Sequence, residues 1–253
     1  TPSLGGADAF LAKFDTQGSL LWTRTIGGNG DDANGGTNQV SGNGTYIAVA
    51  GYTNQPIDGQ TEASGGFISL FTASGTKFWT RMRTDGIGPI YTASDNSLYF
   101  AGVKAGTSDI YITKLDATGS QVWTNTYGTA GTDNPVQISI NTAGELFVLA
   151  NTTGAFPGYV NSGGIDNAFL RINTVTGSLI AASQWGSSVS EESIQFSLAD
   201  DGSLFVAGSV QASLPGNIFG GGTYDPYLIK FVLNNGPTDL TFTSSGIAEN
   251  SAA

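Results

Sequence analysis

Short apolar stretches separated by glycine-rich turns run along almost the whole chain. In "YIAVAGY" and "FLAKF" the side chains of both parities are mostly apolar, which is typical of strands that are covered on both faces. The turns between the stretches contain Gly, Asn or Asp, the residues that hairpins need. No segment argues convincingly for a helix. The pattern predicts an all-β chain made of hairpins.

One hairpin recurs along the sequence. It begins with "ADAFLAKFDTQG" and returns as "GGFISLFTASG", "SDIYITKLDATG", "DNAFLRINTVTG" and "YDPYLIKFVLNNG". A second pair of strands alternates with it, as in "VQISINTAGELFVLA" and "IQFSLADDGSLFVAG". The unit is four short strands in roughly 44 to 58 residues, the length of a propeller blade. We predict a β-propeller-type array of about four four-stranded blades plus a partial one, an arc of a larger propeller; a flat solenoid of hairpins is the competing arrangement.

The repeated residues resemble the bacterial repeats named for seven-bladed β-propellers. The resemblance rests on "DAFLAKFD..G..LW" with its echo "DIYITKLDATG..VW", on "LFVAG" and "LFVLA", and on the loops "NQPIDG", "AFPGYVNSGG" and "SLPGNIFGGG". It covers nearly all of residues 1–236. The loop "VKAGTS" of the second unit departs from it, being short and without Pro. The resemblance implies a propeller fold, but this family has no single agreed activity.

Residues 237–253, "PTDLTFTSSGIAENSAA", break the repeat pattern. Pro237 follows a Gly where a domain end is expected, and the segment resembles the opening of a cadherin-like bacterial adhesion repeat. We therefore predict a propeller repeat domain over 1–236 and a linker with the stub of a following domain over 237–253. These resemblances imply a long secreted or surface protein, located outside the cell. The chain begins inside a blade, so we expect residues 19–26 and 225–232 not to pair within one chain.

Charge and composition restrict the partners. Nine Lys and Arg against twenty Asp and Glu give a net charge of −11, which disfavours nucleic acid and anionic membranes. Cys and His are absent, which excludes disulfides, thiolate or imidazole zinc sites and Ser-His-Asp triads. No apolar run is long enough for membrane insertion. The expected partners are an extracellular glycan or protein, or neighbouring copies of the same protein.

Four acids recur at one place in the repeat. They precede the turn of the inner strand pair by 11 or 12 residues, at the start of the innermost strand of a propeller blade, and are Asp32, Asp85, Asp133 and Glu191. They are candidate metal ligands for a hard cation, with calcium as the expected ion. In the other interpretation each carboxylate accepts backbone N–H groups in its own turn. We expect the second, and therefore no cofactor.

Aromatic residues divide into two groups. Trp22, Trp79 and Trp123 recur once per unit, as expected of side chains that fill the gap between blades. The variable loops instead carry candidate ligand-binding residues, for which ordinary loop packing is the alternative: Tyr52, Phe156, Tyr159, Phe219 and Tyr224.

Adjacent carboxylates such as Glu191 and Glu192 raise the question of catalysis. Neighbours on a strand point to opposite faces, so such a pair is a poor acid/base couple by itself. No catalytic residue is singled out. We predict a non-enzymatic binding, adhesion or structural scaffold module of a large secreted or surface bacterial protein. The alternative is a carbohydrate-active enzyme, a glycosidase or polysaccharide lyase, that assembles carboxylates from several blades.

Overall fold

The computed structural model describes residues 4–32, 39–62, 64–199, 203–214, 219–233 and 240–243. All regular structure within these ranges is β-strand, as predicted. The described part of the chain contains no helix long and apolar enough to cross a membrane. By contact density the chain divides into two compact units, unit 1 with residues 1–105 and 111–124 and unit 2 with residues 106–110 and 125–253.

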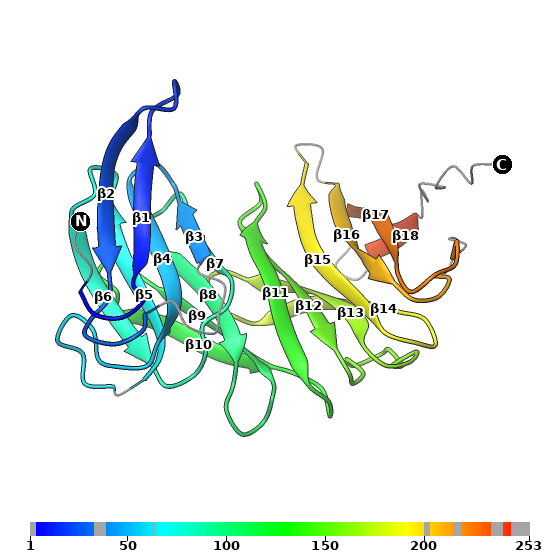
Figure 1. Ribbon diagram of the computed structural model, residues 1–253. Helices are drawn as coiled ribbons and strands as arrows, with labels where there is room; N and C mark the ends of the chain where they lie inside the picture. Colours follow the sequence, from blue (N-terminus) through cyan, green and yellow to red (C-terminus); the bar gives the residue numbers. More distant parts are fainter. Residues whose placement is uncertain are drawn as a thin grey trace. The chain divides into compact units, whose positions relative to one another are not determined.

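The strands form five sheets, each of strands that follow one another in sequence (Figure 1). The first sheet has two strands, β1 (Ala9–Phe14) and β2 (Leu20–Ile26); the other four have four strands each. The second sheet contains β3 (Gln39–Gly42), β4 (Tyr46–Thr53), β5 (Gly65–Thr72) and β6 (Lys77–Arg83). The third contains β7 (Ile90–Thr92), β8 (Leu98–Val103), β9 (Ile110–Leu115) and β10 (Gln121–Tyr127).

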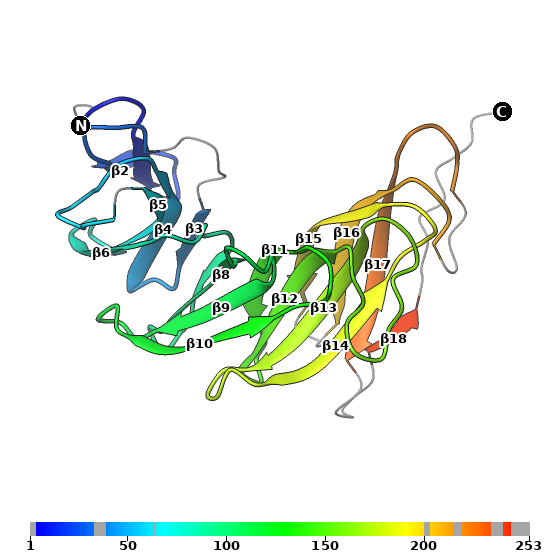
Figure 2. The same cartoon turned by 90° about the horizontal axis from the view of Figure 1, so that it is seen from below.

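The last two sheets belong to unit 2, and Figure 2 shows them from below. One contains β11 (Asp133–Ile140), β12 (Glu145–Thr152), β13 (Asp166–Asn173) and β14 (Leu179–Trp185). The other contains β15 (Glu191–Leu198), β16 (Leu204–Val210), β17 (Asp225–Leu233) and β18 (Leu240–Thr243). A four-stranded antiparallel meander repeated along the chain is the architecture of propeller blades. The predicted fold class is therefore confirmed, and the sheets are called blades one to five below.

The core of unit 1 lies on both faces of the second blade. Val49 and Phe67 pack against Leu11 of the first blade, whereas their neighbours Ala50 and Ile68 face a cluster that includes Phe100 of the third blade. Alternate side chains of one strand thus enter two different clusters. This arrangement explains why both parities of these strands are apolar in the sequence.

In unit 2 the core lies between the fourth and fifth blades. Phe169 lies against Phe147 with the rings tilted and their centroids 5.3 Å apart, and it meets Phe196 of the fifth blade edge-on at 5.3 Å. Trp185 and Phe231 lie 5.0 Å apart in the same cluster. Aromatic contacts of this kind hold two sheets at a fixed separation.

Of the repeated tryptophans, Trp22 and Trp79 pack on the next blade, as predicted, but to different degrees, whereas the ring contact of Trp123 lies within its own blade. Trp79 is 8% exposed, and its Nε1–H donates to the carbonyl of Ala117 at 3.0 Å. Trp22 and Trp123 are half-buried. Trp123 contacts Tyr99 with the ring centroids 6.0 Å apart. The expectation that Trp123 would be largely buried is therefore met only in part.

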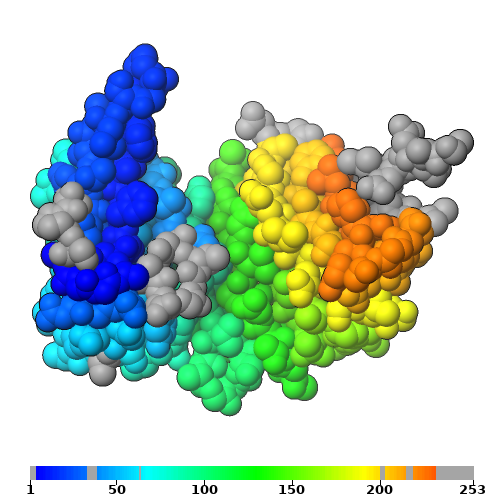
Figure 3. Space-filling model, in the orientation of Figure 1, coloured from blue at the N-terminus to red at the C-terminus, as the bar shows by residue number. Residues whose placement is uncertain are grey.

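The first blade leaves apolar side chains in solvent. The turn end of its hairpin extends beyond the rest of unit 1 (Figure 3). The exposed residues on it are Phe10, Phe14, Leu20 and Leu21.

Within the described residues β2 pairs with β1. β17 lies between β16 and β18. That residues 19–26 and 225–232 do not pair within one chain stays a prediction.

Of residues 237–253, the structure describes only the strand β18. Its pairing with β17 places Phe242 opposite Phe231, so this part of the segment completes the fifth blade. The domain boundary after residue 236 and the cadherin-like character of the segment stay predictions.

Candidate functional site

Three of the four predicted acids occupy equivalent positions within their own units. Asp133 and Glu191 begin β11 and β15, and Asp32 lies in the segment before β3. All three are fully buried. Each accepts the backbone N–H of the residue four positions earlier, from Gly28, Thr129 and Ser187, at 2.7 Å. The predicted bonding to backbone N–H groups is confirmed for these three.

These carboxylates also accept hydrogen bonds from hydroxyl groups. Thr53 donates to Asp32 and Thr152 donates to Asp133, both at 2.5 Å. In the fifth blade Val210 takes the strand position opposite the acid, and the hydroxyl of Ser187 donates to Glu191 instead. Hydrogen bonds to a carboxylate are charge-assisted and therefore stronger than those between neutral groups. Each of these acids thus links the segment that leads into an inner strand to the residues that donate to it.

Asp85 departs from the pattern. It is half-buried, and its Oδ1 accepts the N–H of Ala105, twenty residues later, at 3.1 Å. Within the described ranges no three or more Asp and Glu side chains come together as a metal site would require. The metal-binding role predicted for the four acids stays a prediction.

Of the aromatics predicted to lie in loops, Tyr52 lies instead in strand β4, where it pairs with Gly66 of β5. Tyr52, Tyr159 and Tyr224 are 38%, 37% and 58% exposed, and Phe219 is half-buried. Phe156 is only 2% exposed, and its N–H donates to the side chain of Gln184 at 2.9 Å. No described cavity brings two of the five together. Their role in ligand binding stays a prediction.

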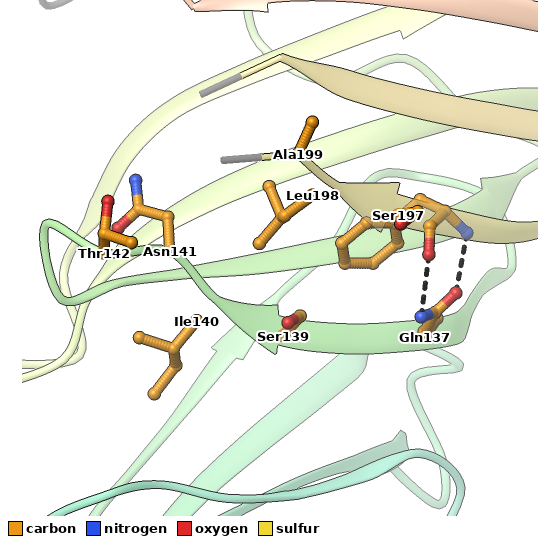
Figure 4. A pocket seen from close by; sticks show the side chains of 9 residues that line it. Gln137, Ser139, Ile140, Asn141, Thr142, Ser197, Leu198 and Ala199 are labelled. Carbon is orange, nitrogen blue, oxygen red and sulfur yellow. Dashed lines mark hydrogen bonds between the residues drawn. The ribbon is translucent and has the colours of Figure 1, made fainter. Parts of the chain in front are cut away.

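A groove in unit 2 was not identified from the sequence. It has a volume of about 390 Å³ and lies between β11 with the turn after it and β15 (Figure 4). The side chain of Gln137 joins the two strands: its Nε2 donates to the carbonyl of Phe196 at 2.9 Å, and its Oε1 accepts the N–H of Phe196 at 2.6 Å. These two hydrogen bonds between the Gln137 side chain and the Phe196 backbone tie β11 to β15 at the groove.

The described residues that line the groove include polar side chains but no ionisable one. Hydroxyl groups of Ser139, Thr142 and Ser197 line it beside the apolar Ile140 and Leu198. Hydroxyls that both donate and accept, next to apolar surface, suit an uncharged ligand rich in hydroxyl groups. One signal in the sequence points to these positions, because the motif Gln-x-Ser recurs on the inner strands at 39–41, 137–139 and 195–197.

No family model matches this sequence, and no curated protein sequence does. Solved structures with a similar fold include hydrazine synthase from Kuenenia stuttgartiensis, with a TM-score of 0.56, 12% identity and coverage of 87% of this chain and 56% of that chain. The full extracellular region of plexin A4 gives a TM-score of 0.50, 14% identity and coverage of 88% and 32%. The β-propeller domain of the Trilobed protease from Pyrococcus furiosus gives 0.48, 10% identity and coverage of 83% and 57%. This chain spans less than two thirds of each, and likeness at such identities concerns the fold alone.

Proposed function

We propose that this chain is a non-enzymatic binding module of a larger extracellular or surface protein and that its ligand is an uncharged glycan. The groove between β11 and β15 carries the proposal, because its described lining residues combine hydroxyl groups with apolar surface and include no ionisable side chain. The resemblance of residues 1–236 to secreted propeller repeats, and of 237–253 to an adhesion repeat, supports the extracellular location. The proposed module needs no cofactor.

Binding fits this groove better than catalysis does. Glycosidases use two carboxyl groups on either side of the scissile bond, about 5 to 9.5 Å apart. The part of the groove lining that the structure describes contains no Asp or Glu. The acids Asp32, Asp133 and Glu191 are fully buried and already hold hydrogen bonds, so they are not available to a substrate.

A glycan array probed with the full chain tests the proposal, together with turnover assays on the same polysaccharides. We expect retention of uncharged glycans, competed by the free sugar, and no release of shortened products. The variant Ser139→Ala/Ser197→Ala should bind at least severalfold more weakly, because each lost hydrogen bond contributes about 1 kcal/mol. Ser162→Ala is the matched control, since this exposed serine of unit 2 lies outside the groove.

Two results would contradict the proposal. Cleavage of any tested polysaccharide by the purified chain would favour the enzyme alternative. Equal binding by the double variant and the control would show that the groove is not the binding site.

A further inference from the structure

Two buried carboxylates of unit 2 face each other across a glycine. Asp166 begins β13 in the fourth blade, and Glu191 begins β15 in the fifth. Both are fully buried. A Cβ placed on Gly186 would lie 2.1 Å from Oδ1 of Asp166 and 2.9 Å from Oε2 of Glu191. The two oxygens therefore lie within about 5 Å of each other, where like charges disfavour each other's ionised form.

The donors around the pair leave one oxygen without a hydrogen bond. The Oδ2 atom of Asp166 accepts the N–H of Ser162 and the Nε2 group of Gln184, each at 2.9 Å. Glu191 accepts the N–H and the hydroxyl of Ser187. The Oδ1 atom of Asp166, which faces Glu191, is buried without any partner. A buried acceptor without a donor is costly, so a proton at this place would supply the missing bond.

Among the described residues, the charge that acts on Glu191 is the like charge of Asp166. The ion pairs Lys77–Asp58 and Arg171–Glu145 do not involve the pair. The titratable groups that the strand pairing and contacts place around the pair are Asp133, beyond Thr152, Asp225, beyond Val210, and Tyr227. These neighbours are acids and a phenol, so two full negative charges would lie buried without a counter-ion.

We propose that Asp166 and Glu191 hold one proton between them at neutral pH, so that the pair carries one negative charge instead of two. The proton is taken up from solvent when the chain folds at neutral pH, and it lies between Oε2 of Glu191 and Oδ1 of Asp166. A calcium ion fits this place less well, because calcium takes six to eight oxygen ligands, while three of the four carboxylate oxygens already accept hydrogen bonds. Burial raises the pKa of Glu191, and the charge of Asp166 adds to the same direction.

The same juxtaposition recurs in unit 1. A Cβ on Gly27 would lie 2.3 Å from Oδ1 of Asp8 and 2.6 Å from Oδ2 of Asp32. The second blade departs from this pattern: Gly65 stands where other blades have the Asp, and Thr84 stands where they have the Gly. A Cβ on Gly65 would lie 3.2 Å from the Cα of Thr84. The glycine is thus what allows a carboxylate to approach the next strand.

The sign of the pH dependence follows from the raised pKa of Glu191. Between the ordinary carboxyl pKa and the raised folded one, the folded chain holds a proton that the unfolded chain has released. The free energy of unfolding therefore falls as pH rises through this window. For one proton the unfolding equilibrium constant rises by at most about tenfold per pH unit.

Urea unfolding of the full chain from about pH 5 to about pH 9 tests the proposal, a range in which ordinary carboxyls are ionised. The wild type should lose stability with rising pH. Glu191→Gln, which mimics the protonated carboxyl, should remove this part of the slope. Asp133→Asn is the matched control, because that carboxylate accepts hydrogen bonds on both oxygens; it should lower stability while the slope remains.

Infrared spectra of the folded wild type, with isotope-labelled glutamate and aspartate, give a test that does not depend on a variant. A protonated carboxyl band should be present at neutral pH in wild type and in Asp133→Asn. Absence of that band would overturn the proposal. So would its loss on adding calcium chloride, because a cation would then occupy the pair. Neither result bears on glycan binding in the groove.

Discussion

Substituting Gly119 by Ala tests whether this turn of the outer hairpin requires glycine because the indole of Trp79 packs against it. Gly119 has φ +80°, a left-handed conformation that costs an L-residue about 1–2 kcal/mol. Its Cβ would also lie 2.9 Å from Cε2 and 3.1 Å from Cδ2 of Trp79. Forcing a methyl group into such a contact costs about 1–3 kcal/mol more. Gly119→Ala should therefore lower the free energy of unfolding by about 2–5 kcal/mol.

Gly18 provides the matched control, because it occupies the same turn of the first hairpin. It has φ +84°, and no atom lies within 4 Å of its Cβ position. Both turns are closed by the same bond, from Gly18 to Asp15 at 3.1 Å and from Gly119 to Asp116 at 3.0 Å. Gly18→Ala should therefore show the backbone cost alone, about 1–2 kcal/mol.

Urea unfolding followed by circular dichroism measures both variants. In a Trp79→Leu background the extra cost of Gly119→Ala over Gly18→Ala should largely disappear, because the indole that the methyl group meets is gone. Equal costs for the two alanine variants in the wild-type background would refute the assignment of Trp79 to this turn. An extra cost that persists without the indole would do the same.

Three further predictions follow from single contacts. Trp79→Ala should cost about 3–5 kcal/mol by loss of buried contact, and Trp22→Ala clearly less because Trp22 is half-buried, as urea unfolding can compare. Thr152→Val should cost about 1.5–3 kcal/mol in the same assay, since Asp133 loses a hydroxyl donor at 2.5 Å. Burial raises the pKa of Tyr127 to about 12, so the difference in tyrosinate absorbance between wild type and Tyr127→Phe should titrate near that pH. The folded state should also lose stability as pH rises above the ordinary tyrosine pKa, because the unfolded chain then releases a proton that the folded chain keeps. An absorbance difference that titrates at the ordinary tyrosine pKa would contradict this prediction.

The sequence predicted features that depend on neighbours along the chain. Hairpins follow from alternating apolar residues and turn residues, which act over a few positions. The bonding of Asp133 was predictable for the same reason, since its N–H donor Thr129 is four residues away. Phe156 shows the limit of such inference. Its burial depends on a contact with Gln184, 28 residues later, for which the loop sequence gives no signal.

The candidate sites depend on more distant contacts. Gln137 and Phe196 join two strands 59 residues apart to form the groove, so neither strand alone indicates it. Asp166 and Glu191 belong to different blades, although a local signal exists, because Gly27, Gly128 and Gly186 each precede an acid by five residues. That spacing places the acid at the start of an inner strand. The spacing does not show which acid lies opposite, because Asp166 and Glu191 are brought together only when the fourth and fifth blades pack.

Equivalent serines of the inner strands have different surroundings in the two units, and this difference bears on where a ligand binds. In unit 1 the hydroxyl of Ser41 accepts the N–H of Thr92 at 2.8 Å, and the carbonyl of Ser41 accepts the hydroxyl of Thr92. In unit 2 the strands are joined by Gln137 instead, and Ser139 and Ser197 face the groove. A hydroxyl that already holds two strands together is less available to a ligand. The repeat therefore supplies the same strand to both units, and the residue that joins neighbouring strands decides which serine hydroxyls take part in that junction.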